Sequence, residues 1–208
     1  MTGWRRLRRG LGLTQSDVAK AAGISRTALS HIERGRSTPS SQTEGSLRRA
    51  LDPFANTVRL IHPRSPQKAA ETLRDIASGQ GLRYALTLDV AAWLLTGYQT
   101  PSAAWAYVRP LEAWTEEVLA TGASWASPTE RANLLLLRAP EEALGGTEVR
   151  GFRLVPLPRI VADGARLGGR HALDAARLYL EFPEARRPGL RLDPDAVVKA
   201  WEETGPWR

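Results

Sequence analysis

The sequence contains no cysteine, only three histidines and no long apolar run. Without cysteine, disulfide bridges, thiolate metal sites and cysteine nucleophiles are excluded. The histidines, His31, His62 and His171, are widely separated along the chain, so we expect no metal site and no cofactor. No apolar stretch approaches the ~20 residues of a membrane-spanning helix, and the basic start MTGWRRLRRG lacks a following signal-peptide core. These absences predict a cytoplasmic protein of bacterial type.

Positive charge is concentrated in the first quarter of the chain. The whole sequence carries 29 Lys and Arg against 22 Asp and Glu, a formal net charge of +7. Residues 1–50 hold 10 basic and 3 acidic side chains, and 10 − 3 already equals +7. Residues 51–208 therefore carry 19 of each sign and are neutral. We expect the N-terminal region to attract a polyanion, as a phosphate-binding surface does.

The stretch from Leu7 to Pro39 has the spacing of short helices joined by a tight turn. Thr14 is a good N-cap, because its hydroxyl can accept from free backbone N–H groups of the first helical turn. Apolar spacing predicts a helix over Gln15–Ala22. Gly23 follows it and can adopt the left-handed conformation that a turn between crossing helices requires.

A further short helix follows this turn. Ser25 is its expected cap, and it spans Arg26–Arg34 with Leu29 and Ile32 facing inward. Its outer face then carries a cation, two hydroxyls and an imidazole, which suit base edges and phosphates. These outward residues are Arg26, Thr27, Ser30 and His31.

Helices on either side should complete this region. Helical spacing places Leu7 and Leu11 on one face of a preceding helix. A short helix is expected near Glu44–Leu51, and Leu47 and Phe54 are available with Leu51 to close the core.

The pattern LGLTQxxxAxxxGIS, followed by IExG, resembles the repressor/Cro-type helix-turn-helix, or XRE, family over about the first forty residues. The resemblance implies an ion pair between Arg8 and Glu33 that holds the fold. It implies that Arg26, Thr27 and His31 read bases. Together with the outward face of the helix, this gives the predicted DNA-binding residues Gln15, Ser25, Arg26, Thr27, Ser30, His31, Arg34 and Arg36. The remaining arginines of the first helix either flank the DNA backbone or stay solvated; they are Arg5, Arg6 and Arg9. The alternative interpretation of the whole region is a helical hairpin that is used only for protein contacts.

Residues 56–208 alternate strand-like and helix-like segments. Strands are expected at 56–63, 83–87 (or a helix lead), 103–108, 133–137 and 152–157. Helices are expected at 65–76, 89–95, 111–119, 158–165, 171–182 and 193–203, with one helical turn at 141–144. The run NLLLL at 133–137 is apolar throughout, which predicts a central strand. Trp93, Trp105 and Trp114 are expected in the core.

The predicted fold class is therefore α+β, with an all-α helix-turn-helix domain at 1–55 and a small mixed α/β domain at 56–208. Residues 80–182 carry apolar blocks similar to the C-terminal domain of AbiEi-type antitoxins, including YALTLDVAAWLLTGYQTPSAAWAYV. That resemblance implies a nucleotidyltransferase-like, catalytically degenerate domain and a toxin-like protein partner. The family usually carries a winged helix at its N-terminus, which this chain replaces with the repressor type.

The sequence contains few residue patterns that indicate catalysis. A nucleotidyltransferase needs a Gly-Ser turn followed by Asp-x-Asp to hold a metal. Here Gly45-Ser46 is followed only by Asp52, and Asp193-Pro-Asp195 is the expected cap of the last helix. The sequence has no P-loop and no G-x-S-x-G elbow. Structural pairing with arginine is the favoured role of the remaining acids in apolar surroundings, Asp89, Asp163 and Glu181. We predict no enzymatic activity.

The sequence thus predicts a two-domain regulator that binds double-stranded DNA as a homodimer, with the second domain supplying the dimer interface or a partner- or effector-binding surface. The first alternative is an antitoxin-like protein whose C-terminal domain binds a toxin-like partner. The second is a protein of DNA repair or organisation that binds DNA without sequence preference.

Overall fold

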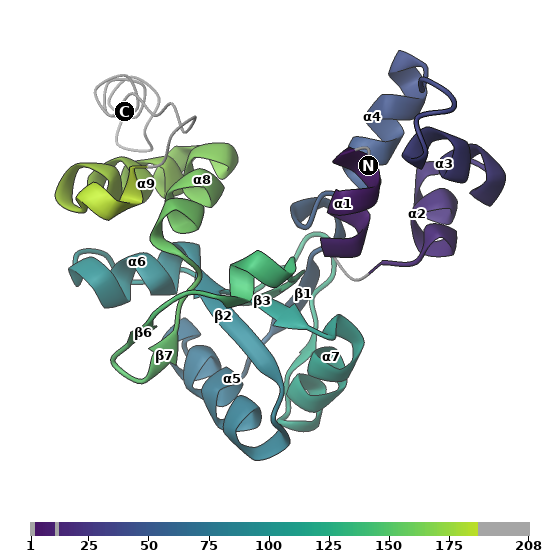
Figure 1. The fold of residues 1–208 in the computed structure, drawn as a ribbon. Coiled ribbons are helices and arrows are strands. Elements are labelled where there is room, and N and C mark those ends of the chain that lie inside the picture. The colour runs from purple at the N-terminus through teal and green to yellow at the C-terminus, as the bar shows by residue number, and fades with distance from the viewer. Residues whose placement is uncertain (1–2, 11–12, 187–208) are drawn as a thin grey trace.

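The computed structural model describes residues 3–10 and 13–186 (Figure 1). The predicted helix at 193–203 and the side chain of Leu11 lie outside these described residues. Four helices form an N-terminal unit, defined here as residues 3–51 within the described ranges. They are α1 (Gly3–Gly10), α2 (Gln15–Ala22), α3 (Arg26–Glu33) and α4 (Ser41–Ala50).

Local capping explains where α2 begins and ends. The Thr14 hydroxyl accepts from the backbone N–H of Asp17 at 3.1 Å, and the Asp17 carboxylate accepts from the backbone N–H of Thr14 at 2.8 Å. This reciprocal capping box satisfies two donors that the first turn would otherwise leave unpaired. Gly23 ends the helix in the left-handed conformation at φ 67°. The predicted bounds of α2 and the predicted cap of α3, Ser25, are confirmed.

The N-terminal unit has its own apolar core. Val18, Leu29, Ile32, Leu47 and Leu51 are buried in it. The expectation that Leu7 helps to form this core is wrong, because its side chain is 53% exposed. Trp4, one turn earlier in α1, packs against the core in its place.

The second unit, defined as residues 58–186 and called the sheet unit, contains a five-stranded mixed sheet. Its strand order is β2-β3-β5-β1-β4. The strands are β1 (Val58–Ile61), β2 (Arg83–Thr87), β3 (Ala104–Arg109), β4 (Ser124–Trp125) and β5 (Leu134–Arg138). The leucine-rich strand β5 is central, as predicted, and runs parallel to β3 and antiparallel to β1. The fold class of the described chain is α+β, a helical region followed by this mixed sheet.

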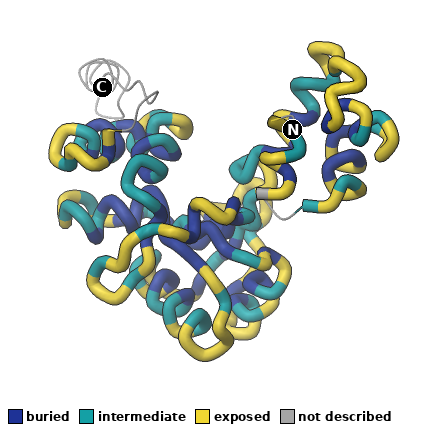
Figure 2. The backbone as a smooth tube through the Cα atoms, in the orientation of Figure 1, coloured by how far each residue is buried: buried dark blue, intermediate teal, exposed yellow. Residues whose placement is uncertain are grey.

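Helices cover both faces of the sheet (Figures 1 and 2). One face packs on α5 (Pro66–Gln80) and α7 (Leu111–Ala120), where the fully buried Trp114 contacts Tyr84. Toward the other face lie α6 (Leu88–Thr96), α8 (Leu157–Leu167) and α9 (Gly169–Glu181). Trp93 and Trp105 are half-buried against the same core, so all three tryptophans expected in the core contribute to it.

Short elements complete the described chain. They are the single helical turns η1 (Phe54–Asn56), η2 (Glu141–Leu144) and η3 (Pro183–Ala185), and the hairpin of β6 (Glu148–Val149) with β7 (Phe152–Arg153). The strand or edge segment expected at 152–157 is present as β7 and a bridge between Leu154 and Leu86, but the expectation is wrong at Leu157, where α8 begins. None of the described helices is long and apolar enough to cross a membrane.

The segment after α4 joins the two units. Phe54 was expected in the N-terminal core, but it packs on the sheet unit, 6.1 Å from Trp105 and 6.4 Å from Tyr107 between ring centroids. Arg166 of α8 pairs with Asp52 and lies over the Phe54 ring. The chain is thus attached to the sheet unit within three residues of the end of the N-terminal core.

The contact between α8 and α9 depends on a glycine. A Cβ atom added at Gly164 would lie 2.5 Å from the carbonyl oxygen of His171 and 2.8 Å from the Cβ of Ala175. We expect Gly164→Ala to lower the free energy of unfolding by about 1–3 kcal/mol, because the backbones must move apart. Gly79→Ala in α5 is the matched control, since its added Cβ meets nothing within 4 Å. It should raise stability by up to about 1 kcal/mol through helix propensity. Urea unfolding of both variants measures the difference, and equal effects would contradict the close packing.

Candidate nucleic-acid interface

Helix α3 presents two rows of side chains away from its core. Arg26, Ser30 and Arg34 follow one another at four-residue intervals, as do Thr27 and His31, so each row lies along one side of the helix. Arg26, Thr27, His31 and Arg34 are exposed, and Ser30 is half-buried. Figure 1 shows α3 on the side of the N-terminal unit that is remote from the sheet. The surface of α3 is therefore open to a large ligand.

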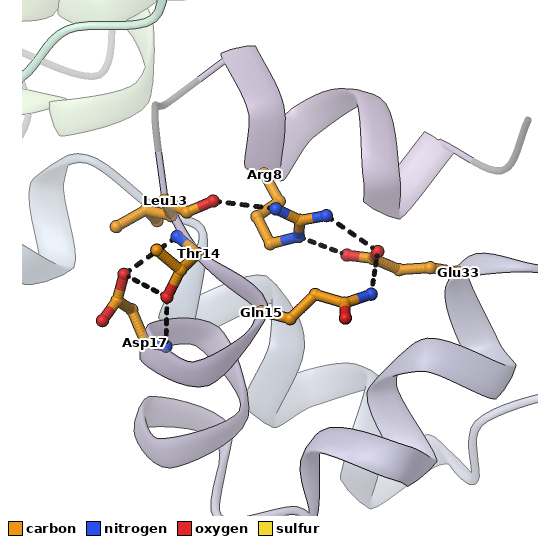
Figure 3. A network of polar contacts seen from close by, with 6 residues as sticks. All are labelled: Arg8, Leu13, Thr14, Gln15, Asp17 and Glu33. Carbon is orange, nitrogen blue, oxygen red and sulfur yellow. Dashed lines mark hydrogen bonds and ion pairs between the residues drawn. The ribbon is translucent and has the colours of Figure 1, made fainter.

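A buried polar network fixes α3 against α1 and α2 (Figure 3). Arg8 donates from Nε to Glu33 Oε1 at 2.6 Å and from Nη2 to Glu33 Oε2 at 3.0 Å. Its Nη1 donates to the carbonyl oxygen of Leu13 at 2.8 Å. Gln15 Nε2 donates to Glu33 Oε2 at 2.9 Å. The ion pair predicted between Arg8 and Glu33 is present, with both residues buried.

The same network controls the charge of Glu33. Burial raises the pKa of this carboxyl, but the hydrogen bonds and positive charge of Arg8 and the hydrogen bond of Gln15 outweigh it. The net result is a pKa below its usual value, so Glu33 is ionised at neutral pH. This pair is therefore an internal support of the interface and leaves Arg8 no role as a free cation.

A cationic hollow of about 460 Å³ lies beside this network. Besides Arg8 and Glu33, its walls include four arginines from α1 and α3, and the first residues of α2. The four are Arg5, Arg9, Arg26 and Arg34. None of them has an ion-pair partner among the residues that the structure describes. Free backbone N–H groups at the start of a helix add to the attraction for an anion. The lining therefore makes this hollow a cationic concavity of the N-terminal unit.

The predicted DNA-binding residues fall into three places. Gln15, Arg26 and Arg34 line the hollow. Thr27 and His31 lie on the exposed face of α3, and Ser30 is more covered. The Ser25 hydroxyl accepts from the backbone N–H of Ala28 at 3.1 Å, so it caps α3. Arg36 is exposed in the loop that follows α3.

Sequence reasoning missed the gathering of these residues into one concavity. It left Arg5 and Arg9 undecided and did not name Ser16, which also lines the hollow. The arginine-rich sequence of α1 was the available signal, but the direction in which its side chains point depends on how α1 packs on α3.

The three acids of the sheet unit that were expected to pair with arginine each have a local partner. Asp163 accepts from Thr87 Oγ1 at 2.9 Å and from Arg159 Nε at 2.8 Å, and burial raises its pKa in spite of Arg159. Glu181 pairs with Arg177 at 2.6 Å. The pairing with arginine expected for both acids is present. Asp89 differs, because its partners are Ser102 and His171.

Asp89 belongs to a titratable cluster between α6 and α9. Its Oδ1 lies 2.7 Å from His171 Nδ1, and its Oδ2 accepts from the backbone N–H of Ser102 at 3.1 Å. Burial alone would raise the pKa of Asp89. The contacts with His171 and Ser102 lower it by more, so the net pKa is below its usual value. Asp174 of α9 faces Asp89, with Arg170, His171 and Arg177 also near.

Asp174 should make stability depend on pH. Burial, and then repulsion by Asp89, raise the pKa of Asp174 from 3.8 to about 6. The stability that the protonated Asp174 carboxyl contributes to the folded state is fully present below pH 3.8. It is lost as the pH rises through about 6 and the carboxyl ionises. We expect Asp174→Asn to stabilise the protein at pH 8 by on the order of 1 kcal/mol, after allowance for solvent screening, and to have little effect at pH 4. Thermal unfolding at both pH values measures this, and a pH-independent effect would contradict it.

Comparison with known proteins identifies only the N-terminal region. Residues 5–52 match the protein family described as Helix-turn-helix (HTH_3). Searches of curated proteins and of solved structures returned no match. The matched residues are a helix-turn-helix domain of the XRE type, which indicates DNA binding and a transcriptional regulator. The region that follows is not identified by these comparisons.

Proposed function

We propose that this chain is a sequence-specific regulator, a repressor or autoregulator, that reads the major groove of DNA with α3. The observation that carries the proposal is the position of the cationic hollow directly beside the exposed face of α3. A phosphate held in the hollow by Arg5, Arg9 and Arg34 fixes the register of the helix on the duplex. Arg26, Thr27 and His31 then meet base edges, which carry the sequence information.

We further propose that the regulator binds as a homodimer. Helix α3 has 8 residues, so one copy reaches few base pairs. Helix-turn-helix proteins gain affinity and spacing specificity by occupying two half-sites about one helical turn apart. The sheet unit is the proposed source of the dimer interface. We assign it a binding role and no catalytic one, since its buried acids are held by the internal partners described above.

Selection from random duplexes tests this function. The full-length protein is incubated with a random library, and bound duplexes are recovered and sequenced over several rounds. We expect enrichment of an inverted repeat with half-site centres about 10 bp apart. If the recovered duplexes share no sequence and bind no more tightly than the starting library, the result would instead support the alternative in which the protein binds DNA without sequence preference.

An antitoxin-like function is the second candidate. The apolar blocks over residues 80–182 resemble the AbiEi-type C-terminal domain, and the lack of a Gly-Ser turn followed by Asp-x-Asp supports a role for it without catalysis. Co-expression with the product of the adjacent reading frame tests this candidate. Relief of growth inhibition and a stable complex would favour it. Unimpaired growth of cells that express the adjacent reading frame without this chain would count against the candidate.

A further inference from the structure

A short connector, defined here as residues 52–57, joins the N-terminal unit to the sheet unit. Leu51 is the last buried residue of the N-terminal core and β1 begins at Val58, so the connector has 57 − 51 = 6 residues. A free chain of six residues would have an r.m.s. end-to-end distance of roughly 12–15 Å. DNA rises only ~3.4 Å per base pair. A dimer with free connectors could therefore follow half-sites over several base pairs, whereas a dimer with fixed connectors could not.

Hydrogen bonds hold the connector in one local shape. Asp52 Oδ1 accepts from the backbone N–H of Phe54 at 2.9 Å. Asn56 Nδ2 donates to the carbonyl oxygen of Asp52 at 3.2 Å, and Thr57 Oγ1 donates to the carbonyl oxygen of Phe54 at 2.8 Å. These bonds surround the helical turn η1 and pair backbone groups within the connector itself. The connector is therefore a folded turn and not an extended linker.

Phe54 attaches this turn to the sheet unit. Its ring centroid lies 6.1 Å from that of Trp105 and 6.4 Å from that of Tyr107, and both partners belong to β3. Tyr107 is fully buried, and its hydroxyl donates to Asp163 of α8 at 3.2 Å. Strand β3 is itself paired on both sides, by β2 and β5. Phe54 thus packs on a part of the sheet unit that is fixed by the core.

Arg166 of α8 makes two contacts with the connector. Its guanidinium carbon lies 5.2 Å from the centroid of the Phe54 ring, and its Nη2 pairs with Asp52 Oδ2. A cation over an aromatic ring is attracted by the negative face of the ring. The Asp52 carboxylate is thus used twice, by the Phe54 N–H and by Arg166. One side chain of the sheet unit therefore contacts both the first residue of the connector and its aromatic ring.

We propose that Phe54 and Arg166 are positioning residues that set the half-site spacing of the operator, because they hold the N-terminal unit and the sheet unit together as one body. The inference rests on the proposed function, since it needs a dimer that joins through the sheet unit. One added base pair moves a half-site by ~3.4 Å and turns it by about 35° around the DNA axis. Two copies of α3 held at one separation and one rotation cannot both follow that change.

Binding to inverted repeats of different spacing tests the proposal. The full-length protein is titrated into duplexes that carry both selected half-sites at the selected separation, or one or two base pairs closer or farther apart. We expect the wild type to bind the shifted duplexes at least about tenfold more weakly, because only one α3 then reaches its half-site. Phe54→Ala should reduce this penalty to below about threefold, because freed connectors span the difference. Arg166→Ala, which leaves the apolar packing intact, should reduce it in part.

A duplex with a single half-site should bind the wild type and both variants alike, because α3 and the cationic hollow are unchanged in them. Spacing penalties that stay at the wild-type level in both variants would overturn the assignment.

The β6–β7 hairpin offers matched controls outside the connector. Phe152 of this hairpin is also half-buried against the sheet core. Arg74 of α5 lies 5.1 Å from the centroid of its ring and pairs with Asp75. Phe152→Ala and Arg74→Ala therefore remove an equivalent ring and an equivalent guanidinium, and the spacing penalty should be unchanged in both. An equal loss of the penalty in these controls would attribute it to general loosening of the sheet unit and would overturn the assignment.

Backbone ¹⁵N relaxation without DNA separates this inference from the proposed function. We expect the amides of α2 and β5 to report the same rotational correlation time in the wild type, and those of α2 a shorter one in Phe54→Ala. Separate tumbling of the two units already in the wild type would overturn the inference, whatever the protein does with DNA. Equal binding of selected and shuffled duplexes by a wild type whose units tumble together would instead contradict the proposed function, and with it the spacing, while supporting the attachment by Phe54.

Discussion

Replacing Glu33 by alanine is expected to lower the free energy of unfolding of the N-terminal unit by about 3–5 kcal/mol. The reason is the buried guanidinium of Arg8, which loses both hydrogen bonds to Glu33 and retains only the one to Leu13. An unpaired buried charge costs more than the pair itself contributes. Hydrogen exchange of the amides of α2 and α3 measures the loss in this unit separately from the sheet unit.

The matched control is an exposed ion pair of the same unit. Glu44 and Arg48 are paired at 2.6 Å on the surface of α4, so Glu44→Ala should cost at most about 0.5 kcal/mol. The double variant Arg8→Met/Glu33→Leu should recover much of the stability lost in Glu33→Ala, because no charge is then buried alone. A Glu33→Ala variant no less stable than Glu44→Ala would show that the pair does not support the fold.

Acid should destabilise the N-terminal unit of the wild-type protein, as the Glu33→Ala replacement does. Since the folded-state pKa of Glu33 is lowered, its contribution is present above the usual value of 4.5 and is lost as the pH falls toward the folded-state value. The protection factors of the α3 amides, which are the intrinsic exchange rates divided by the observed ones, should therefore fall below about pH 4.5 in the wild type. The double variant should lack this dependence.

Arginine replacements on α3 are expected to separate reading of sequence from attraction to phosphate. Arg26→Ala should reduce the preference for the selected sequence by about 5- to 150-fold, which corresponds to the ~1–3 kcal/mol of a bidentate base contact. Arg34→Ala should weaken binding to all sequences alike and lower the slope of log K against log salt by about 1. Both residues line the same hollow, so their roles are separated by these measurements and not by position. Fluorescence anisotropy with selected and shuffled duplexes provides both quantities.

A charge control accompanies these two variants. Lys68 of α5 is exposed and paired with Glu71 at 2.7 Å, in the sheet unit and outside the hollow. Lys68→Ala should change neither the preference nor the salt slope. Equal losses on selected and shuffled DNA for Arg26→Ala and Arg34→Ala would remove Arg26 as a reader of bases.

The features that the sequence predicts best are those set by neighbouring residues. The cap at Thr14, the left-handed Gly23 and the cap at Ser25 involve groups within three residues of each other, and all are present. The central position of β5 was also predictable, because an apolar strand must be covered on both faces.

The features that were missed depend on packing between distant segments. Leu7 is apolar yet exposed, since α1 turns Trp4 toward the core, and Phe54 contacts the sheet unit although it follows α4 directly. Asp89 and His171 are 82 positions apart, so no spacing rule relates them (171 − 89 = 82). The two-residue strand β4 is too short to show an alternating pattern.

The central claim is that α3 reads a DNA sequence, and anisotropy across salt tests it most directly. The full-length protein is titrated into the selected duplex and its shuffled counterpart at salt concentrations from ~50 to ~300 mM. We predict a preference of more than about 100-fold that persists at the highest salt, because base contacts do not depend on counterion release. Equal affinities that fall together as salt increases would contradict the account and leave the cationic hollow as a site for DNA backbone alone.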